Sequence, residues 1–276
     1  MNPNASRHDL LYATDSTTGQ VFVYAYPKGT LEGVLTSAFG PTGDCVDAKG
    51  YIWIPDGSNA RILKYAHGGT SPIAVLFDQG QTADGCSIDP RTGDLAIANE
   101  FNVIVFKHAK GQGVSYYDSA MKYIYWGGYD NAGNFFIDGL TAQGSFQFAE
   151  LPRGGRAFTN LTFTQVQVPG DVVWDGRYVT VGDQLTGTIY QVQVKSSVVT
   201  VVGQTQMIGA GDPCFQFTYS NFGGTGHQAQ RIVATDFGGQ KTGTVALWDY
   251  PAGGSPYFTF PGNFYPTGVA ISPVHR

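Results

Sequence analysis

The chain has 276 residues, with 16 basic and 21 acidic side chains and a formal net charge of −5 at pH 7. Charged residues make up 13% of the chain, about half their usual share in globular domains, whereas aromatic residues make up 14% and glycine is abundant. The chain is too apolar to be disordered and carries too little positive charge to bind a nucleic-acid backbone. It contains no apolar run of about 18 residues that could span a membrane. The composition predicts a soluble, turn-rich β protein.

Three short apolar segments, 10–15, 20–26 and 30–36, are predicted to form strands after a flexible tail at 1–9. From residue 24 onward one pattern recurs, in which an alternating strand with an aromatic residue is followed by a turn and a second apolar strand. Its copies begin at Tyr24, Tyr65, Phe106, Phe148, Tyr190 and Leu247, at spacings of 41, 41, 42, 42 and 57 residues. Six units of about 42 residues are typical of a β-propeller.

A further hairpin precedes four of these copies, at 44–54, 85–98, 128–138 and 172–181. Each hairpin contains an aspartate followed closely by glycine, which fits a type I turn that ends in a left-handed glycine. The aspartates that open these turns are Asp47, Asp89, Asp130 and Asp175. Each unit is therefore predicted to hold four antiparallel strands, A to D, running outward from a central axis.

The last predicted strand, PTGVAIS at 266–272, is an A strand with no strands B to D after it. The segments at 10–15, 20–26 and 30–36 supply the missing strands B, C and D. We therefore expect the C-terminal strand to complete the N-terminal blade, which removes the open edges of the array. The prediction is a monomeric six-bladed, all-β propeller forming a single domain over 1–276.

The hairpins, with the spacing G-x-x-x-D-x-x-G-x-[ILF], and the turn Y-A-H-G-G-T at 65–70 resemble those of NHL-repeat propellers. More loosely, the chain resembles the gluconolactonase/senescence-marker and paraoxonase-like six-bladed propellers. The resemblance covers nearly the whole chain and implies the fold. Propellers of this sort include hydrolases, lyases and binding modules, so the resemblance alone selects no activity.

Aspartates near the starts of the A strands form the candidate site. Asp44, Asp171 and Asp84 lie three, four and five residues before the turn aspartate of their hairpins, and Asp212 lies at a similar level. Turn chemistry would use equal offsets, so we interpret these acids as an axial group. Two carboxylates ~6 Å apart repel by about 3 kcal/mol at an effective dielectric constant of ~20, so the group requires a cation, protonation or abundant water.

One hypothesis is a metal ion, calcium foremost, held at the axis by Asp44, Asp84, Asp171 and Asp212. Calcium accepts 6–8 oxygen ligands in flexible geometry, and the resemblance to the gluconolactonase-like group permits it at this place. The alternative is a solvated acidic funnel without an ion. Acids and amides at the B-strand ends are instead predicted to cap turns: Asp15, Asp56, Asn99, Asp138, Asp183 and Asp236.

Aromatic residues in the segments that lead into the A strands are candidates for the rim of the pocket. They are Phe39, Tyr123, Tyr125, Trp126, Phe260, Phe264 and Tyr265. We expect Tyr125, Trp126 and Tyr265 to contact a ligand, since ring faces attract cationic amines. The alternative is that these rings pack between blades.

Histidine and cysteine are predicted to have structural roles. His67 and His108 occupy the same position of the repeat and are predicted to be turn residues. The cysteines, Cys45, Cys86 and Cys214, are odd in number and widely spaced, which favours buried small side chains over disulfides or a zinc site.

The favoured function is a binding propeller of NHL type, whose acidic axial pocket takes a divalent cation or a cationic small molecule. The alternative is a calcium-dependent hydrolase of lactones or esters, with an amine-using enzyme of the strictosidine-synthase type as a third hypothesis. The composition, poor in lysine and glutamate, favours an extracellular or periplasmic location, although no signal peptide is visible in this chain.

Overall fold

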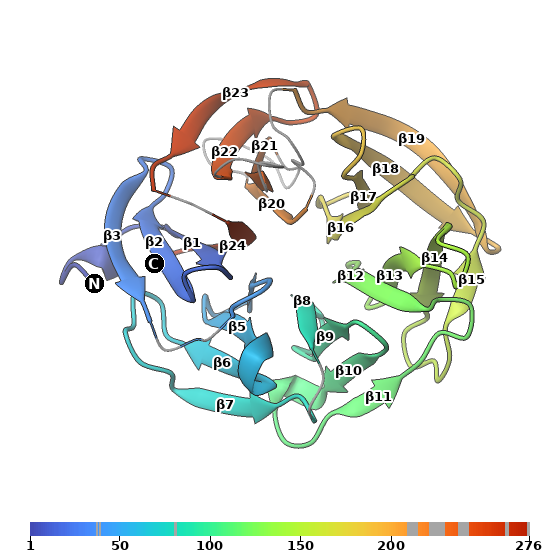
Figure 1. Ribbon diagram of the computed structural model, residues 1–276, viewed down its shortest axis with the longest axis horizontal. Helices are drawn as coiled ribbons and strands as arrows, with labels where there is room; N and C mark the ends of the chain where they lie inside the picture. Colours follow the sequence, from blue (N-terminus) through green and yellow to red (C-terminus); the bar gives the residue numbers. More distant parts are fainter. Residues whose placement is uncertain are drawn as a thin grey trace.

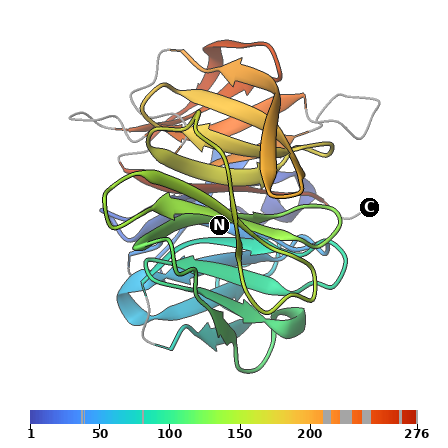
Figure 2. The ribbon, with the colours of Figure 1, turned by 90° about the vertical axis from the view of Figure 1, so that its right-hand side faces the viewer.

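The computed structural model describes residues 1–36, 38, 40–79, 82–208, 215–220, 230–236, 243–262 and 265–274. Six four-stranded sheets stand around a central axis as the blades of a propeller (Figure 1). Figure 2 shows the same ring from its side. The six-bladed, all-β architecture expected from the repeat is confirmed. In the described part of the chain, no helix is long and apolar enough to cross a membrane.

Blade 1 combines the two ends of the chain. Its strands run outward from the axis as β24 (Pro266–Ser272), β1 (Leu10–Asp15), β2 (Gln20–Ala25) and β3 (Thr30–Leu35). Strand β24 pairs antiparallel with β1, from Leu10 opposite Ser272 to Asp15 opposite Pro266. The predicted closure of the ring is therefore confirmed, and the bounds of the last strand agree with those expected.

In the other five blades the strands run outward in sequence order. Blade 2 contains β4 (Cys45–Val46), β5 (Ile52–Asp56), β6 (Arg61–Tyr65) and β7 (Ala74–Phe77). Blade 3 contains β8 (Ala83–Ile88), β9 (Leu95–Asn99), β10 (Val103–Phe106) and β11 (Val114–Tyr116). Blade 4 contains β12 (Tyr123–Tyr129), β13 (Phe135–Leu140), β14 (Phe146–Leu151) and β15 (Thr159–Leu161).

The last two blades are built in the same way. Blade 5 contains β16 (Pro169–Trp174), β17 (Val179–Asp183), β18 (Thr188–Lys195) and β19 (Val198–Gln206). Blade 6 contains β20 (Phe217–Ser220), β21 (Arg231–Asp236), β22 (Thr244–Asp249) and β23 (Gly253–Phe260). Three single-turn 3-10 helices are described besides the strands: η1 (Ala5–Arg7), η2 (Gly57–Asn59) and η3 (Lys107–Ala109). Within residues 1–9, expected to be a flexible tail, Ala5 is 1% exposed and packs in the core of blades 1 and 2.

The A–B hairpins follow the predicted turn chemistry. Asp47 accepts hydrogen bonds from the backbone N–H groups of Lys49 and Tyr51, and Gly50 closes the turn at φ 73°. Only glycine adopts this left-handed conformation without strain. The same arrangement recurs at the other three aspartates, so the turn role expected of these residues is confirmed.

Histidine has the structural role expected of it. His67 Nδ1 lies 2.7 Å from Ser272 Oγ and its Nε2 lies 3.0 Å from the carbonyl oxygen of His8, so this side chain ties blade 2 to both ends of the chain. His108 Nδ1 lies 2.8 Å from the carbonyl oxygen of Thr92, between two turns of blade 3.

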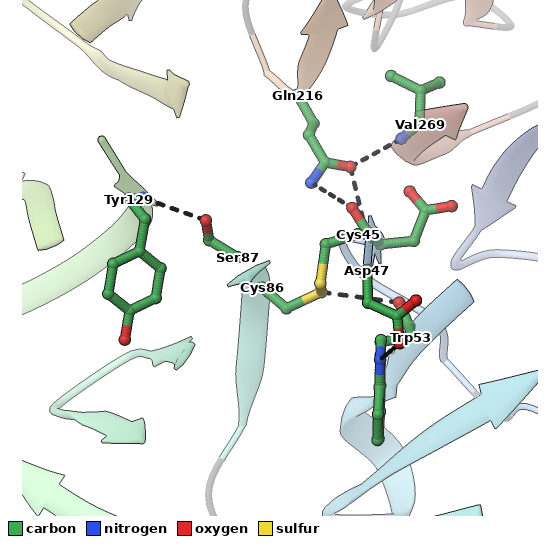
Figure 3. The surroundings of a disulfide bond; sticks show 9 residues. Cys45, Asp47, Trp53, Cys86, Ser87, Tyr129, Gln216 and Val269 are labelled. Carbon is green, nitrogen blue, oxygen red and sulfur yellow. Dashed lines mark hydrogen bonds between the residues drawn. A yellow bond between two sulfur atoms is a disulfide. The ribbon is translucent and has the colours of Figure 1, made fainter. Parts of the chain in front are cut away.

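The prediction for two of the cysteines is wrong. Cys45 in β4 and Cys86 in β8 form a disulfide that joins the inner strands of blades 2 and 3, with 5.7 Å between their Cα atoms (Figure 3). The two residues are separated by 41 positions, which is the repeat spacing, so they occupy equivalent places in neighbouring blades. Cys214 lies outside the described residues.

Close packing at the axis depends on glycine. A Cβ at Gly128 of β12 would lie 2.0 Å from the carbonyl oxygen of Val172 in β16, closer than any real contact. At Gly268 of β24, a Cβ would lie 2.5 Å from Thr14 Oγ1 and 2.6 Å from Gln216 Oε1. These contacts show how tightly the inner strands of adjacent blades approach one another.

Replacing the disulfide should destabilise the ring. The double change Cys45→Ser and Cys86→Ser should lower the free energy of unfolding by about 4 kcal/mol, because the link no longer restricts the unfolded chain. Urea unfolding with and without reductant measures this effect. Reductant should leave the serine variant unchanged, and equal stability of the two oxidised proteins would contradict the prediction.

The glycine requirement predicts a contrast between two alanine substitutions. Gly128→Ala should destabilise the protein by about 2 kcal/mol, since the new methyl group overlaps the backbone of blade 5. Gly57→Ala is the control, because its Cβ would meet no atom nearer than 3.6 Å, and it should change stability by no more than about 0.5 kcal/mol. Thermal melting of both variants tests the difference.

Candidate ligand-binding site

A cavity of about 270 Å³ lies on the propeller axis. The inner strands of all six blades line it, with residues 44–46, 86–88, 127–129, 171–174, 216–218 and 269–271, together with Pro90. In each inner strand, the later lining residues lie nearer the A–B hairpin than the earlier ones. The cavity therefore extends from the level of Asp44 and Asp171 towards the hairpin face, where Pro90 and Trp174 line it.

Asp44 is the least satisfied acid in the wall of this cavity. It is 3% exposed, and neither carboxylate oxygen accepts a hydrogen bond from a described residue. Burial raises the pKa of Asp44 well above its usual value, and the neighbouring Asp171 raises it further. This environment favours the neutral form of the carboxyl group, and a positive charge close by would favour the ionised form.

Asp171 lines the same cavity but has hydrogen-bond donors. Its Oδ1 accepts the N–H of Val172 at 2.9 Å, and its Oδ2 accepts the N–H of Phe217 in the next blade at 3.1 Å. Burial raises the pKa of Asp171 to about 7, and these two backbone bonds partly oppose the shift. The structure thus brings together two of the four predicted acids.

Gln216 connects three blades beside these acids, and sequence reasoning missed it. Its Oε1 accepts the N–H of Val269 at 2.7 Å (Figure 3). The same oxygen lies 3.4 Å from the backbone nitrogen of Asp44, and Nε2 lies 3.4 Å from the Asp44 carbonyl oxygen. Gln216 is 4% exposed. The one available signal was the segment DPCFQF, which departs from the hairpin pattern of the other units.

The other predicted acids lie outside the cavity lining or outside the described residues. Asp84 is half-buried at an irregularity of β8, and burial together with Glu100 raises its pKa to about 7. Asp212 lies outside the described residues. The roles predicted for Asp84 and Asp212 stay predictions.

The expected capping acids divide into two kinds. Asp15, Asp56 and Asp183 accept hydrogen bonds from the turns that follow them, as predicted. Asp138 instead accepts the N–H of Trp126 at 3.2 Å and is fully buried. Burial raises the pKa of Asp138 well above its usual value, and Asp171 adds to the shift, so Asp138 belongs electrostatically to the axial acids.

The three aromatic residues predicted to contact a ligand lie outside the cavity lining. Trp126 is 2% exposed, and its ring packs edge-on against Phe215 with 4.9 Å between centroids. Both residues directly precede cavity-lining residues in the chain, so they lie on the side opposite the hairpins. Tyr125 packs beside the same apolar cluster, and the N–H of Tyr265 donates to Asp15 at 2.9 Å. None of the three predicted residues lines the cavity, and their contact with a ligand stays a prediction.

The carboxylate oxygens around the cavity fit a single positively charged group better than a calcium ion. Asp44 offers two free oxygens, whereas both oxygens of Asp171 are occupied by backbone N–H groups. Among the described residues, no three histidine, cysteine, aspartate or glutamate side chains lie together in a group that could hold a metal ion. Calcium prefers 6–8 oxygens, so calcium at the axis stays a prediction.

Comparison with known proteins supports the fold. No protein-family model matches the sequence, and no curated protein matches it. A chain in the crystal structure of a nidogen/laminin complex superposes with a TM-score of 0.76 at 14% identity, over 97% of this chain and 100% of that one. A protein of unknown function from Bacteroides caccae gives 0.69 at 10% identity, over 96% and 99% of the chains.

Streptogramin B lyase gives a TM-score of 0.55 at 12% identity, over 77% of this chain and 69% of that one. These identities establish a shared propeller fold and no shared activity. The finer resemblance to NHL repeats is not established by these comparisons.

The raised pKa of Asp44 predicts an unusual dependence of stability on pH. The folded protein holds this proton more tightly than the unfolded chain does, so stability should fall as pH rises from about 4 towards the raised folded-state pKa. Relative to Asp44→Asn, the wild type should lose up to about 1.4 kcal/mol per pH unit in this window. Urea unfolding across the pH range measures the difference.

The control is Asp249→Asn, which changes an exposed carboxylate. The same measurement on this variant gives the baseline with which the Asp44→Asn difference is compared. If the Asp44→Asn difference followed the same pH dependence as this baseline, Asp44 would titrate normally and the description of the cavity would be wrong.

Proposed function

We propose that this protein is a binding propeller whose axial cavity takes a small ligand with a positively charged group. The observation that carries the proposal is the buried Asp44 carboxyl group, which lines the cavity and lacks a donor for either oxygen among the described residues. A buried carboxylate is costly unless it is paired. A ligand ammonium would supply both hydrogen-bond donors and the compensating charge.

The rest of the cavity limits the size and character of this ligand. A volume of about 270 Å³ is slightly below the range of roughly 300–1,000 Å³ typical of drug-sized ligands. Val172, Val269 and Ala270 give its wall apolar surface. A compact amine with a short apolar body fits these features better than a polymer or a polyanion.

The disulfide supports an oxidising location for the protein. Cys45–Cys86 lines the cavity at the level of Asp44, and such bonds persist mainly in secreted or periplasmic proteins. The proposal therefore includes an extracellular or periplasmic binding role.

The experiment is a melting and calorimetry screen with methylammonium, guanidinium, tetramethylammonium and Ca²⁺ at constant ionic strength. At least one organic cation should raise the melting temperature of the wild type, and Asp44→Asn should weaken its binding by about tenfold or more. Asp249→Asn, which alters an exposed acid, should bind as the wild type does. A neutral alcohol of matching size should leave the melting temperature unchanged.

Binding should also strengthen with pH. Because Asp44 must lose its proton to pair with a cation, affinity should rise by up to about tenfold per pH unit below the raised pKa of the free protein. Binding that persists in Asp44→Asn, or no binding by any organic cation, would overturn the proposal. Binding of Ca²⁺ that Asp44→Asn abolishes, without binding of any organic cation, would favour the calcium-dependent hydrolase, which a lactone and ester hydrolysis assay would then test.

A further inference from the structure

A second group of buried polar side chains lies at the junction of blades 2 and 3, away from the axial cavity. This junction cluster consists of Asp78, Asn99, Asn102 and Tyr117. Asp78 follows β7, Asn99 ends β9, Asn102 precedes β10 and Tyr117 follows β11. Asp78 and Asn99 are fully buried and Asn102 is 2% exposed, whereas the Tyr117 side chain reaches solvent.

Two buried acceptor oxygens of the junction cluster lack a hydrogen-bond donor among the described residues. Asn99 Nδ2 donates to Asp78 Oδ1 at 3.3 Å and to Asn102 Oδ1 at 3.0 Å, which uses both of its hydrogens. Asn102 Nδ2 lies 3.5 Å from the Tyr117 hydroxyl group. Asp78 Oδ2 and Asn99 Oδ1 then have no donor among the described residues, although both atoms are buried.

Among the described residues, no cationic side chain forms an ion pair with the junction cluster. The ion pairs found among the described residues join Arg61 to Asp56, Lys64 to Asp47 and His108 to Asp94, and none involves Asp78. Burial raises the pKa of Asp78 to about 7, opposed only by the hydrogen bond from Asn99. A buried water could donate to both free oxygens, but it would leave the carboxylate charge uncompensated.

We propose that the junction cluster binds a small oxygen-preferring cation, calcium foremost, through Asp78 Oδ2 and Asn99 Oδ1. Carboxylate and amide oxygens are preferred calcium ligands, and sodium shares this preference for oxygen. The proposal is independent of the axial cavity, because none of these residues lines it. A bound cation would join the outer strand of blade 2 to blade 3, the two blades that the disulfide links nearer the axis.

The test follows melting temperature and terbium luminescence as Ca²⁺, Na⁺ or Tb³⁺ is added at constant ionic strength over the micromolar to millimolar range. Ca²⁺ should raise the melting temperature of the wild type, and Tb³⁺ should show emission sensitised by the nearby Tyr117. A response to Na⁺ with none to Ca²⁺ would identify a sodium site, and this would still support the proposal that the junction cluster binds an oxygen-preferring cation. Asp44→Asn should retain the response of this site, which separates it from axial binding.

Two variants at the junction have opposite expected effects. Asp78→Asn should abolish the cation response, and without cations it should be at least as stable as the wild type, because the isosteric amide removes a buried charge. Asn99→Asp should lower stability without cations and bind Ca²⁺ about tenfold or more tightly than the wild type, because it adds a second carboxylate. The second variant keeps the test decisive if Asp78→Asn fails to fold.

The proposal would be overturned if the wild type responded to no cation. Stability that rises at low pH without any cation response would instead identify a proton shared by Asp78 and Asn99. A calcium response that persists unchanged in Asp78→Asn would place the ion elsewhere.

Discussion

The close approach of six inner strands around one axis is the constraint on which the structure depends. Each blade must bring its first strand within backbone contact of its neighbours, as the contact between Gly128 and the Val172 carbonyl oxygen shows. Where two inner strands approach this closely, a position such as Gly128 has no room for a side chain. The pairing of β24 with β1 closes the ring of blades and stabilises it, because the array is left with no open edge.

This constraint explains why the axial acids have unusual electrostatic properties. Asp44 directly precedes β4 and Asp171 lies within β16, so ring closure removes both from water. Gln216 uses its amide to satisfy backbone groups of blades 1 and 2, which leaves the Asp44 carboxyl group without that donor. Burying this acid is unfavourable and is offset by the large apolar core, and the proposed binding of a positively charged group rests on this buried acid.

Blades 2 and 3 are joined by more than apolar packing. The Cys45–Cys86 disulfide links their inner strands, and Asn99 of blade 3 donates to Asp78 at the end of blade 2. An apolar cluster that includes Trp53, Leu76 and Ile97 fills the space between the two blades. This seam therefore combines covalent, polar and apolar contacts.

The repeat, the turns and the closing strand could all be predicted from the sequence because each depends on local chemistry. An aspartate followed by glycine specifies its own turn through bonds to neighbouring N–H groups, as at Asp47 and Gly50. Alternation of apolar residues predicted the strands, and the surplus strand at 266–272 predicted closure. The disulfide was missed, although the 41-residue separation of Cys45 and Cys86 equals the repeat spacing.

The sequence by itself determined the six-bladed architecture, its order of strands and the residues that close each hairpin. Only the tertiary structure decided which polar groups meet, because Asp44 and Gln216 are 172 residues apart and hairpin spacing says nothing of the contact between them. It also decided that the cavity runs from Asp44 towards the hairpins while Trp126 lies on the other side. The burial and the contacts of these polar groups depend on all six blades at once, because the blades come together only when the ring is closed.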